Sequence, residues 1–393
     1  MKSLSFFSIT LAAVLFSMCC AVGKIECIEP NQLTGSAKAV VLDAAPLAHT
    51  AQVMPLNKKG ELVGKWDVSK QAEQVLLNLD AVLKRAKSDL GKVVKLNVYV
   101  ARAELSDDVS KVLAKQFRGK IKPAVTFVGG DLVHPEVLVT MDAVAVSTFK
   151  TKGNAPVHFA AEDAQFSDVT ILPSGDAVYL AGMAAKGELA SATRETMGKI
   201  QDAIAHLGLK RGDIVQLKAF LLPMSQAAVV RDEIGKFFGE EAVPTIVYVD
   251  WSSSSVPVEI EAILAAPKSQ SEETITYHTP IGTTASPVYS RLARIHSGKR
   301  IYISGLYGRS EQEHDVKEIY EQLDQLLEKT GSSRDHMAKA TYYYSDPKSN
   351  GRLDAFRPAY YNPKTPPTAS KVRVKDVGKA DRGIVIDMIG VTK

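Results

Sequence analysis

An internal repeat is the feature of this sequence that most constrains its fold. A proline that leads an apolar stretch recurs with spacings of 121 and 123 residues, at Pro123, Pro244 and Pro367. An acidic residue near the end of each repeat recurs with spacings of 119 and 126 residues, at Asp142, Glu261 and Asp387. Because two independent landmarks share one period, the sequence predicts three tandem copies of one domain.

Each repeat has the same order of expected elements. A long amphipathic helix is predicted over 68–83 in copy one, because Ala72, Leu76, Leu79 and Leu83 recur at helical spacing. The corresponding helices lie around 197–207 and 319–327, and apolar strands follow them at 93–100, 214–222 and 337–344. We therefore expect an α+β fold, with copy one at 33–148, copy two at 156–267 and copy three at 275–393. Short polar segments at 147–156 and 267–274 serve as linkers.

The N-terminus has the composition of a secretory signal peptide. Lys2 precedes a short apolar run, and small residues follow it near Ala21 and Gly23. The sequence thus predicts a signal peptide at 1–23, a secreted or periplasmic protein, and no stable membrane span after cleavage. Lipoprotein anchoring is less well supported, because Phe16-Ser-Met precedes Cys19. After cleavage Cys27 would be the one remaining cysteine, expected as a free thiol in a flexible leader.

Charge and motifs exclude several classes of function. With 48 basic and 44 acidic residues and no block of one sign, the chain gives no indication of a nucleic-acid partner. The eight histidines form no i, i+4 pair and no H-E-x-x-H motif, so no metal site is expected. A glycine-rich phosphate loop and a G-x-S-x-G elbow are also missing, and we expect no cofactor.

Several short motifs resemble those of the RidA/YjgF reactive-intermediate deaminase family, often labelled endoribonuclease L-PSP. In copy two they are Val178-Tyr-Leu-Ala-Gly-Met183, Asp213-Ile-Val-Gln-Leu-Lys-Ala-Phe220 and Val258-Glu-Ile-Glu-Ala-Ile263. Copy three contains Val288-Tyr-Ser290 and Ile301-Tyr-Ile-Ser-Gly305, and copy one is the most divergent. The resemblance covers nearly all of the chain from Ser36 to Val391.

The resemblance implies a fold and an assembly. The family domain is a chorismate-mutase-like unit, a mixed sheet with two helices, and family members usually form homotrimers with a ligand cleft between subunits. A chain with three copies is then expected to be a monomer that forms an intrachain pseudo-trimer. Its three clefts need not be equivalent, because each copy can change separately.

The resemblance also implies site residues. An arginine that holds the substrate carboxylate in active members corresponds to Val125, Ile246 and Ala369, or to Thr368 if copy three is shifted by one residue. The water-positioning acid corresponds to Asp142, Glu261 and Asp387, of which we take Asp387 and Glu261 as catalytic candidates. The family tyrosine corresponds to Gly35, Phe166 and Tyr289 in copies one, two and three. The Ser-Gly pair corresponds to Thr50-Ala51, Ala181-Gly182 and Ser304-Gly305.

Copy three therefore retains most of the family pattern, and the expected ligand-binding residues are Tyr289, Ser304, Gly305 and Gly182. Arg357 or Arg373 could replace the missing arginine from another element. Two functions remain open. The first is small-molecule binding in interdomain clefts with altered or no catalysis. The second is an imine or enamine deaminase, which forms keto acid and ammonia, with rearranged carboxylate recognition. A ribonuclease is disfavoured, since no basic face with aromatic residues is evident.

Overall fold

The computed structural model describes residues 23–160, 164–253, 255–308 and 313–393. In copy one the elements are β1 (Ile25–Asn31), β2 (Ser36–Leu42), β3 (Leu47–Thr50), α1 (Val68–Arg85), β4 (Val93–Val100), α2 (Ser106–Gln116), β5 (Ala124–Gly129) and β6 (Val139–Val146). In copy two they are β7 (Val157–Ala160), β8 (Ser167–Leu172), β9 (Asp176–Ala185), α3 (Leu189–Ala205), β10 (Ile214–Leu221), α4 (Ala227–Phe238), β11 (Thr245–Asp250) and β12 (Val258–Ala266). In copy three they are β13 (Ile275–His278), β14 (Leu292–Ile295), β15 (Arg300–Ile303), α5 (Asp315–Lys329), β16 (Met337–Tyr344), α6 (Pro347–Tyr360), β17 (Thr368–Arg373) and β18 (Ile384–Val391).

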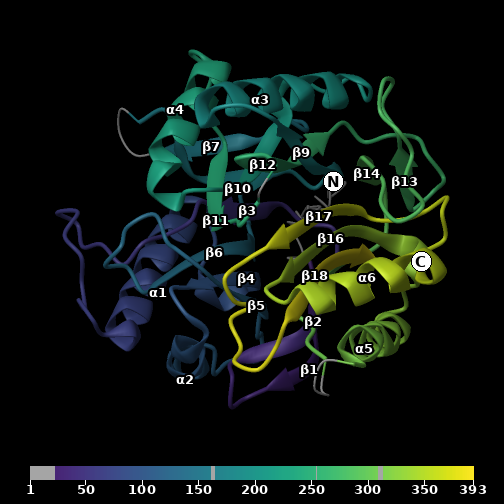
Figure 1. The fold of residues 1–393 in the computed structure, drawn as a ribbon. Helices are drawn as coiled ribbons and strands as arrows, with labels where there is room; N and C mark the ends of the chain where they lie inside the picture. The colour runs from purple at the N-terminus through teal and green to yellow at the C-terminus, as the bar shows by residue number, and fades with distance from the viewer. Residues whose placement is uncertain (1–22, 161–163, 254, 309–312) are drawn as a thin grey trace, which may run out of the picture.

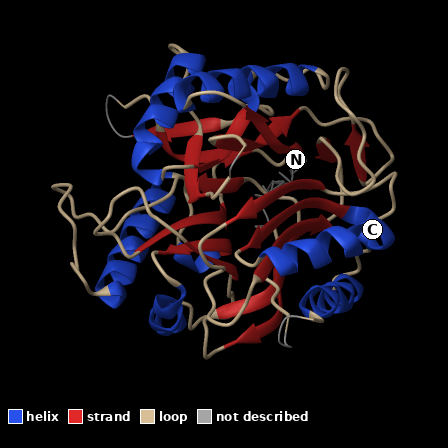
Figure 2. Cartoon of the chain, viewed as in Figure 1, coloured by secondary structure: helices blue, strands red, loops and turns tan. Residues whose placement is uncertain are grey.

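The three copies thus repeat one order of elements: three strands, a helix, a strand, a helix and two strands. The strands gather in the middle of the molecule, and the three helix pairs lie around the outside (Figures 1 and 2). The expected α+β fold with two helices per copy is confirmed. The expected signal peptide lies outside the described residues, apart from Gly23.

Each copy places its first two strands on the sheet of another copy. Strand β8 pairs with β3, β14 pairs with β9, and β2 pairs with β15. The connections from β2 to β3, β8 to β9 and β14 to β15 are short, yet the strands they join lie in different sheets or at different places along one sheet. The exchange satisfies the backbone edges of β3, β9 and β15, which would otherwise be open. Because β2 of copy one pairs with β15 of copy three, the three copies form a closed ring, the intrachain pseudo-trimer that we expected.

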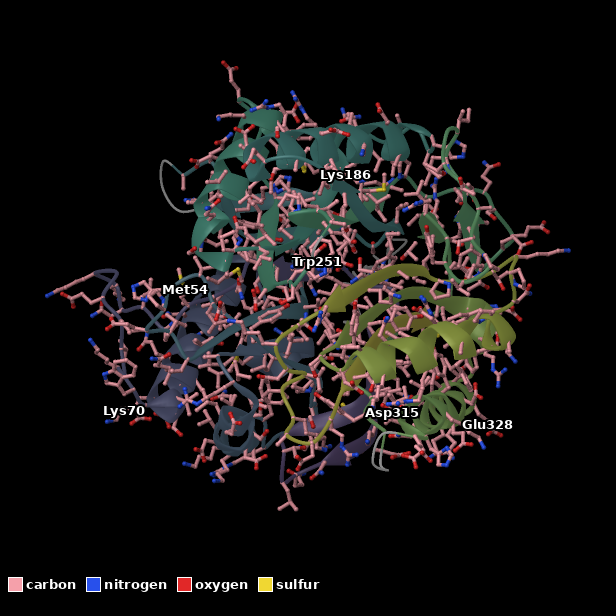
Figure 3. All side chains as sticks on the ribbon, in the orientation of Figure 1. Met54, Lys70, Lys186, Trp251, Asp315 and Glu328 are labelled. Carbon is pink, nitrogen blue, oxygen red and sulfur yellow. The ribbon has the colours of Figure 1, made fainter. Side chains whose placement is uncertain are left out.

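Local sequence explains the helices. In α1 the side chain of Asp67 accepts a hydrogen bond from the backbone of Lys70 and caps the helix N-terminus. Its buried residues lie on one stripe and pack on the sheet of copy one, as in Leu76, Leu79 and Leu83. Side chains on the outer faces, such as Lys70 on α1 and Glu328 on α5, point toward the periphery, whereas Trp251 lies near the middle (Figure 3).

The core has a local part and a shared part. Each helix pair covers an apolar cluster built mainly from its own copy. A further apolar cluster is shared by all three copies and includes Val40, Val94, Tyr179, Val215 and Tyr302. This shared cluster lies where the sheets meet. Burial of apolar surface therefore holds the copies to one another as well as holding each copy together.

Cys27 does not lie in a flexible leader, and that expectation was wrong. It is part of β1, a strand that pairs with β2, and β1 extends copy one beyond the expected start at residue 33. The partly buried thiol lies 3.4 Å from the carbonyl oxygen of Lys122. Cys27 and Ile25 alternate toward the shared core, a period-two pattern typical of a strand with one buried face. The cysteine is unpaired, as expected.

Candidate functional site

Strand register identifies which residues of the three copies are equivalent. Val125, Ile246 and Ala369 are each the second residue of a proline-led strand. They lie opposite Leu96, Leu217 and Ala340, which are themselves equivalent residues on the neighbouring parallel strands. The position that the resemblance assigns to an arginine in copy three is therefore Ala369, and the alternative, Thr368, is excluded.

Main-chain hydrogen bonds correct two correspondences in copy one. The amides of Ala181 and Ser304 donate to Arg291 and Lys38, and the equivalent amide in copy one is that of Ala51, which donates to Asp168. The Ser-Gly pair thus corresponds to Ala51-Gln52, one residue later than we expected from the sequence. In the same way, the amides of Ala37, Ser167 and Ser290 bond to the segments that lead into β5, β11 and β17. Ser36, and not Gly35, is therefore equivalent to Phe166 and Tyr289. The sequence of copy one has diverged around these positions, so it contains no motif that would reveal the one-residue shifts.

Two of the expected ligand-binding residues line an open groove between copies three and one. Ser304, Gly305 and Val125 lie side by side on the wall of a groove of about 640 Å³. Phe127 and Tyr307 add aromatic surface, and the remaining walls come from the β1–β2 hairpin, the start of α2 and the segment around Gly378. The groove is large enough to bind a small molecule.

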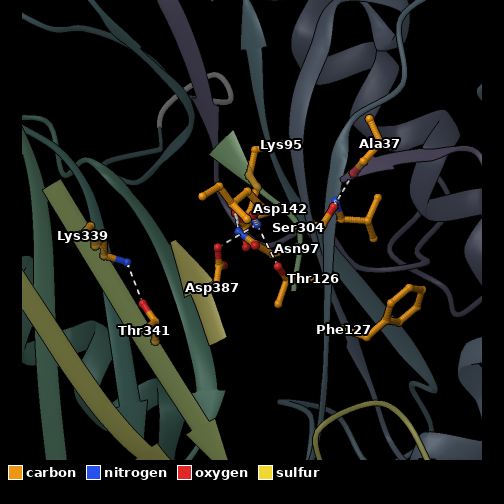
Figure 4. Close-up of polar contacts among 12 residues, drawn as sticks. Ala37, Lys95, Asn97, Thr126, Phe127, Asp142, Ser304, Lys339, Thr341 and Asp387 are labelled. Atoms are coloured by element: carbon orange, nitrogen blue, oxygen red, sulfur yellow. Dashed lines mark hydrogen bonds and ion pairs between the residues drawn. The ribbon is translucent and has the colours of Figure 1, made fainter. Parts of the chain in front are cut away.

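The Ser304 hydroxyl is fully engaged with the protein. It donates to the carbonyl oxygen of Ala37 over 2.6 Å and accepts from the backbone amide of Val125 over 2.7 Å (Figure 4). The next amide, that of Gly305, donates to the carbonyl oxygen of Val125. Ser304 therefore positions the strands of two copies, while the lack of a side chain at Gly305 leaves room for Val385 behind it.

The other two expected residues, Gly182 and Tyr289, belong to a different junction, that of copies two and three. There the carboxylate of Glu259 lies directly over Gly182, where any Cβ atom would overlap it. The guanidinium of Arg291 lies 5.0 Å from the ring centroid of Tyr289, and its buried Nε has no hydrogen-bond partner among the described residues. Burial raises the pKa of Glu259 to about 7; Glu261 adds to this shift, and Ser370 and Arg291 oppose it.

Glu259 is the acid that sequence reasoning passed over. It precedes Glu261 by two residues on β12, so the two carboxylates share a face of the strand. The register places Glu259 opposite Phe220, and its equivalents are Thr140 in copy one and Val385 in copy three. The V-E-I-E pattern carries the signal, because it offers two acids of which only the second was chosen. Arg357 and Arg373 do not take the expected place: Arg357 bonds to Asp354, and Arg373 is exposed on β17.

The two catalytic candidates lie in the centre of the molecule. Asp387 accepts a hydrogen bond from Lys95 over 2.8 Å, and Glu261 accepts from Lys339 over 2.5 Å and from Ser370 over 3.0 Å. Neither of these carboxylates lines the groove that contains Ser304 and Gly305. Figure 4 shows Lys95, Asn97, Asp142 and Asp387 gathered where the strands meet. The structure thus separates these acids from the groove, and their role in orienting water stays a prediction.

Comparison with known proteins identifies the family. The model of the family described as Endoribonuclease L-PSP matches residues 36–147 and 158–266, more than half of the chain. The chain belongs to this family. The two matched segments coincide with copies one and two, and copy three repeats their element order and register.

Each similar protein matches only one part of this chain. A RutC family protein of Pyrococcus horikoshii is 35% identical over 88 residues, which cover 22% of this chain and 68% of that protein. The crystal structure of YyfB from Yersinia pestis, described as a Rid family protein of unknown function, has 29% sequence identity and a TM-score of 0.29. It covers 31% of this chain and 98% of its own. Yeast Mmf1 has 24% identity and a TM-score of 0.25, covering 32% of this chain and 100% of its own.

The third junction of this L-PSP chain, between copies one and two, is closed by a glutamine. Gln52 occupies the position of Gly182 and Gly305, and its side-chain amide donates to the Thr140 hydroxyl over 2.8 Å. Its carbonyl oxygen accepts from the backbone amide of Tyr248 over 3.2 Å. The side chain of Gln52 is bonded to both copies, whereas in the other two junctions Glu259 and Val385 lie against the glycine. The three junctions are therefore chemically different.

The central lysines of the L-PSP chain come from equivalent strands but not from fully equivalent positions. Lys95 and Lys339 share a register position, which in copy two is Gln216, and Lys218 lies two residues further along β10. Burial lowers the pKa of Lys95, and the nearby Asp387 carboxylate partly offsets this shift. Burial by itself would lower the pKa of Lys218, but Tyr343 and three carboxylates together raise it above its usual value. Burial raises the pKa of Asp142, which Lys218, Asn97 and Tyr99 counteract.

Two further features bear on function. Within the described ranges, no group of His, Cys, Asp or Glu side chains is arranged to hold a metal ion. The helices of the same residues include none that is long and apolar enough to cross a membrane.

Proposed function

We propose that this L-PSP family protein is exported and binds a small molecule in the groove between copies three and one, without hydrolysing it there. The observation that carries the proposal is the meeting of Ser304 and Gly305 with Val125 around a groove of about 640 Å³. The apolar side chain at the arginine position and the neighbouring rings of Phe127 and Tyr307 favour a ligand with an apolar body. Export is supported by the N-terminal sequence pattern alone.

The charges of the groove favour an anionic group on that ligand. Lys38 and Lys379 both line the groove, and the ammonium of Lys379 lies 5.2 Å from the ring centroid of Tyr307. Burial, Arg382 and Lys38 lower the pKa of Lys379, while Asp107 opposes the change. Burial is the main cause of this shift and the neighbouring cations add to it; an anion bound between the cations would relieve their repulsion. Two lysines thus offer point charges to an anion where the family arginine would offer a planar fork.

The absence of hydrolysis follows from the residue that faces Gly305. Its near neighbour is the buried Val385, the equivalent of Glu259, so no carboxylate lies against this glycine as Glu259 lies against Gly182. The acids that line the groove are Glu29 and Asp107. Glu29 is paired with Lys329, and Asp107 lies in the first turn of α2. A water molecule beside Gly305 would therefore lack a general base.

Calorimetric titration of the mature chain tests the binding proposal. Benzoate and phenylacetate should bind, whereas benzamide, which has the ring but no charge, should bind at least tenfold more weakly. Lys38→Glu and Lys379→Glu should abolish benzoate binding. Lys186→Glu, at an exposed lysine outside the groove, serves as the matched control. Equal affinity in all three variants would contradict the proposal.

A second function is favoured by the junction of copies two and three. A carboxyl group with a pKa near 7 can both accept and donate a proton at neutral pH, and Arg291 offers a guanidinium to a substrate carboxylate beside it. This junction is where we would place the alternative activity, imine or enamine hydrolysis. Turnover of 2-aminoacrylate-type substrates that is lost in Glu259→Gln and kept in Glu240→Gln, an exposed control, would establish it. No turnover by the wild-type chain would exclude it.

Export is tested separately. Expression of the full chain in a bacterial host, followed by mass spectrometry of the purified protein, should find an N-terminus near residue 22 or 24. An intact Met1 in the cytoplasmic fraction would contradict export without affecting the binding proposal.

A further inference from the structure

A small cavity lies at the centre of the molecule, where strands of all three copies meet. Its volume is about 30 Å³, which exceeds the roughly 10–15 Å³ that one water molecule requires but is far too small for an organic ligand. Three lysines line it, Lys95, Lys218 and Lys339, one from each copy, together with two carboxylates, those of Glu261 and Asp387. The cavity is separate from the groove and from the junction that contains Glu259, because the residues that define those sites do not line it.

Hydrogen-bond donors that face this cavity have no protein acceptor. The Lys218 side chain is buried, with 6% exposure, and its ammonium makes no hydrogen bond within the described part of the chain. By contrast, Lys95 donates to Thr126, to the carbonyl oxygen of Ile303 and to Asp387, which uses all three of its protons. Lys218 therefore has three protons available and a cavity beside it.

Two neighbours of Lys218 add to this set. His49, with 1% exposure, and Tyr302 also line the cavity; the polar side chains of Gln216 and Tyr179 lie beside them, but neither contact has the geometry of a good hydrogen bond. A neutral imidazole supplies one donor, and so does the phenol. One acceptor, the side-chain oxygen of Asn97, is also without a partner. Lys218 thus remains the main donor beside the cavity without a protein acceptor.

The charges of the central core point the same way. Its cations are three lysines and one arginine: Lys95, Lys218, Lys339 and Arg300. Its anions are three carboxylates: Asp142, Glu261 and Asp387. Arg300 is buried, with 7% exposure, and makes no ion pair within the described ranges. Among the described residues its guanidinium forms one hydrogen bond, to the carbonyl oxygen of Gly175 over 3.4 Å.

Two neighbouring groups could have changed this balance, and neither does. Asp176, beside Gly175, already pairs with Arg294 over 2.9 Å. Burial, with a further contribution from Arg300, lowers the pKa of His49 to about 3, so its imidazole is neutral at physiological pH and adds no charge. Among the residues that line the cavity, three lysines and two carboxylates therefore leave one positive charge in excess. An uncompensated charge in a protein interior is costly unless a counter-charge lies close to it.

We propose that the central cavity binds one monatomic anion, chloride under ordinary conditions. The anion accepts hydrogen bonds from the Lys218 ammonium, the Tyr302 hydroxyl and an N–H group of His49, and it neutralises the excess charge of the core. These three ligands come from copies two, three and one. The anion therefore joins the three copies at one point and stabilises their assembly.

Halide replacement tests the proposal. Crystals of the mature protein grown in sodium bromide should show an anomalous peak in the cavity, within hydrogen-bonding distance of Lys218 Nζ. Thermal unfolding midpoints should rise with the logarithm of bromide or chloride concentration, and should not do so in sodium gluconate at the same ionic strength. Lys218→Met should remove both the peak and the halide dependence, and Lys186→Met should keep both.

The outcomes separate an anion from water. Density in the cavity without anomalous signal, together with equal unfolding midpoints in chloride and gluconate, would assign the cavity to water and overturn the proposal. The bromide map of the wild-type protein decides the question even if Lys218→Met fails to fold. Neither result depends on the ligand proposed for the groove.

Discussion

Lys95 of copy one and Asp387 of copy three form a buried ion pair of 2.8 Å between residues 292 positions apart in the sequence. The pair lies close to the place where β2 joins β15 and closes the ring of copies. Glu261 of copy two and Lys339 of copy three form the corresponding link at 2.5 Å. Asp387 and Glu261, the acids near the ends of copies three and two, therefore serve as contacts between copies, each paired with a lysine of a neighbouring copy.

Removal of one partner of the Lys95–Asp387 pair should destabilise the chain. Lys95→Met leaves the Asp387 carboxylate buried without its cation, a change that typically costs about 3–5 kcal/mol. The double variant Lys95→Met, Asp387→Leu should lose less, since an apolar pair of similar size avoids the uncompensated charge. Urea unfolding of the three proteins measures the difference. A double variant less stable than Lys95→Met would contradict this account.

Removal of the N-terminal hairpin should open the ring. A chain that begins at residue 43 lacks β1 and β2, exposes the edge of β15 and loses one wall of the groove. We expect it to aggregate or to self-associate through the exposed edge, and to lose ligand binding. A synthetic peptide of residues 24–42 should restore the monomer when added, as judged by light scattering. A truncated chain that remains monomeric and binds benzoate would show that the hairpin is dispensable.

Replacement of Gln52 by glycine should open the closed junction. Gln52→Gly removes two side-chain hydrogen bonds, each worth about 0.5–1.5 kcal/mol, and gives this position the glycine found at Gly182 and Gly305. The free energy of unfolding should fall by about 1–3 kcal/mol, and a crystal structure should show a new recess beside Thr140. Gln270→Gly, in an exposed linker, is the control and should change neither.

Ionisation of Glu259 should make stability depend on pH. Burial raises the pKa of this carboxyl to about 7, above the value in the unfolded chain, so the protonated form is favoured by folding. Its contribution is fully present below about pH 4.5 and is lost as the pH rises through 7. Glu259→Gln should therefore match the wild type at pH 4.5 and exceed it at pH 8.5, by at most about 3 kcal/mol. Urea unfolding at the two pH values tests this, and a gap that shrinks as the pH rises would contradict the assigned direction.

Much of the secondary structure was predictable from local patterns. The helical spacing of Leu76, Leu79 and Leu83 predicted α1, and the proline-led apolar stretches predicted β5, β11 and β17. These predictions succeed because side-chain periodicity and proline geometry act over a few residues. The one-residue shifts at Ala51 and Ser36 escaped prediction, because they depend on main-chain bonds to strands of other copies.

The site was predictable only in part. Ser304 and Gly305 do line a groove, but the hydroxyl of Ser304 is already engaged with Ala37 and Val125. Glu259 and Glu261 look alike in the sequence, yet one lies over Gly182 and the other pairs with Lys339. Alternation along a strand tells which residues share a face, but not what lies opposite each of them.

The sequence by itself determined that the chain consists of three copies of one α+β domain, because repeats and periodicity are local properties of a chain. Only the tertiary structure decided that each copy places its first hairpin on another copy, that one junction is closed by Gln52 and another holds Glu259, and that the repeated acids meet lysines at the centre. Those outcomes depend on contacts between residues hundreds of positions apart. Such contacts form only when burial and hydrogen bonding bring distant strands together, and no local pattern encodes their register.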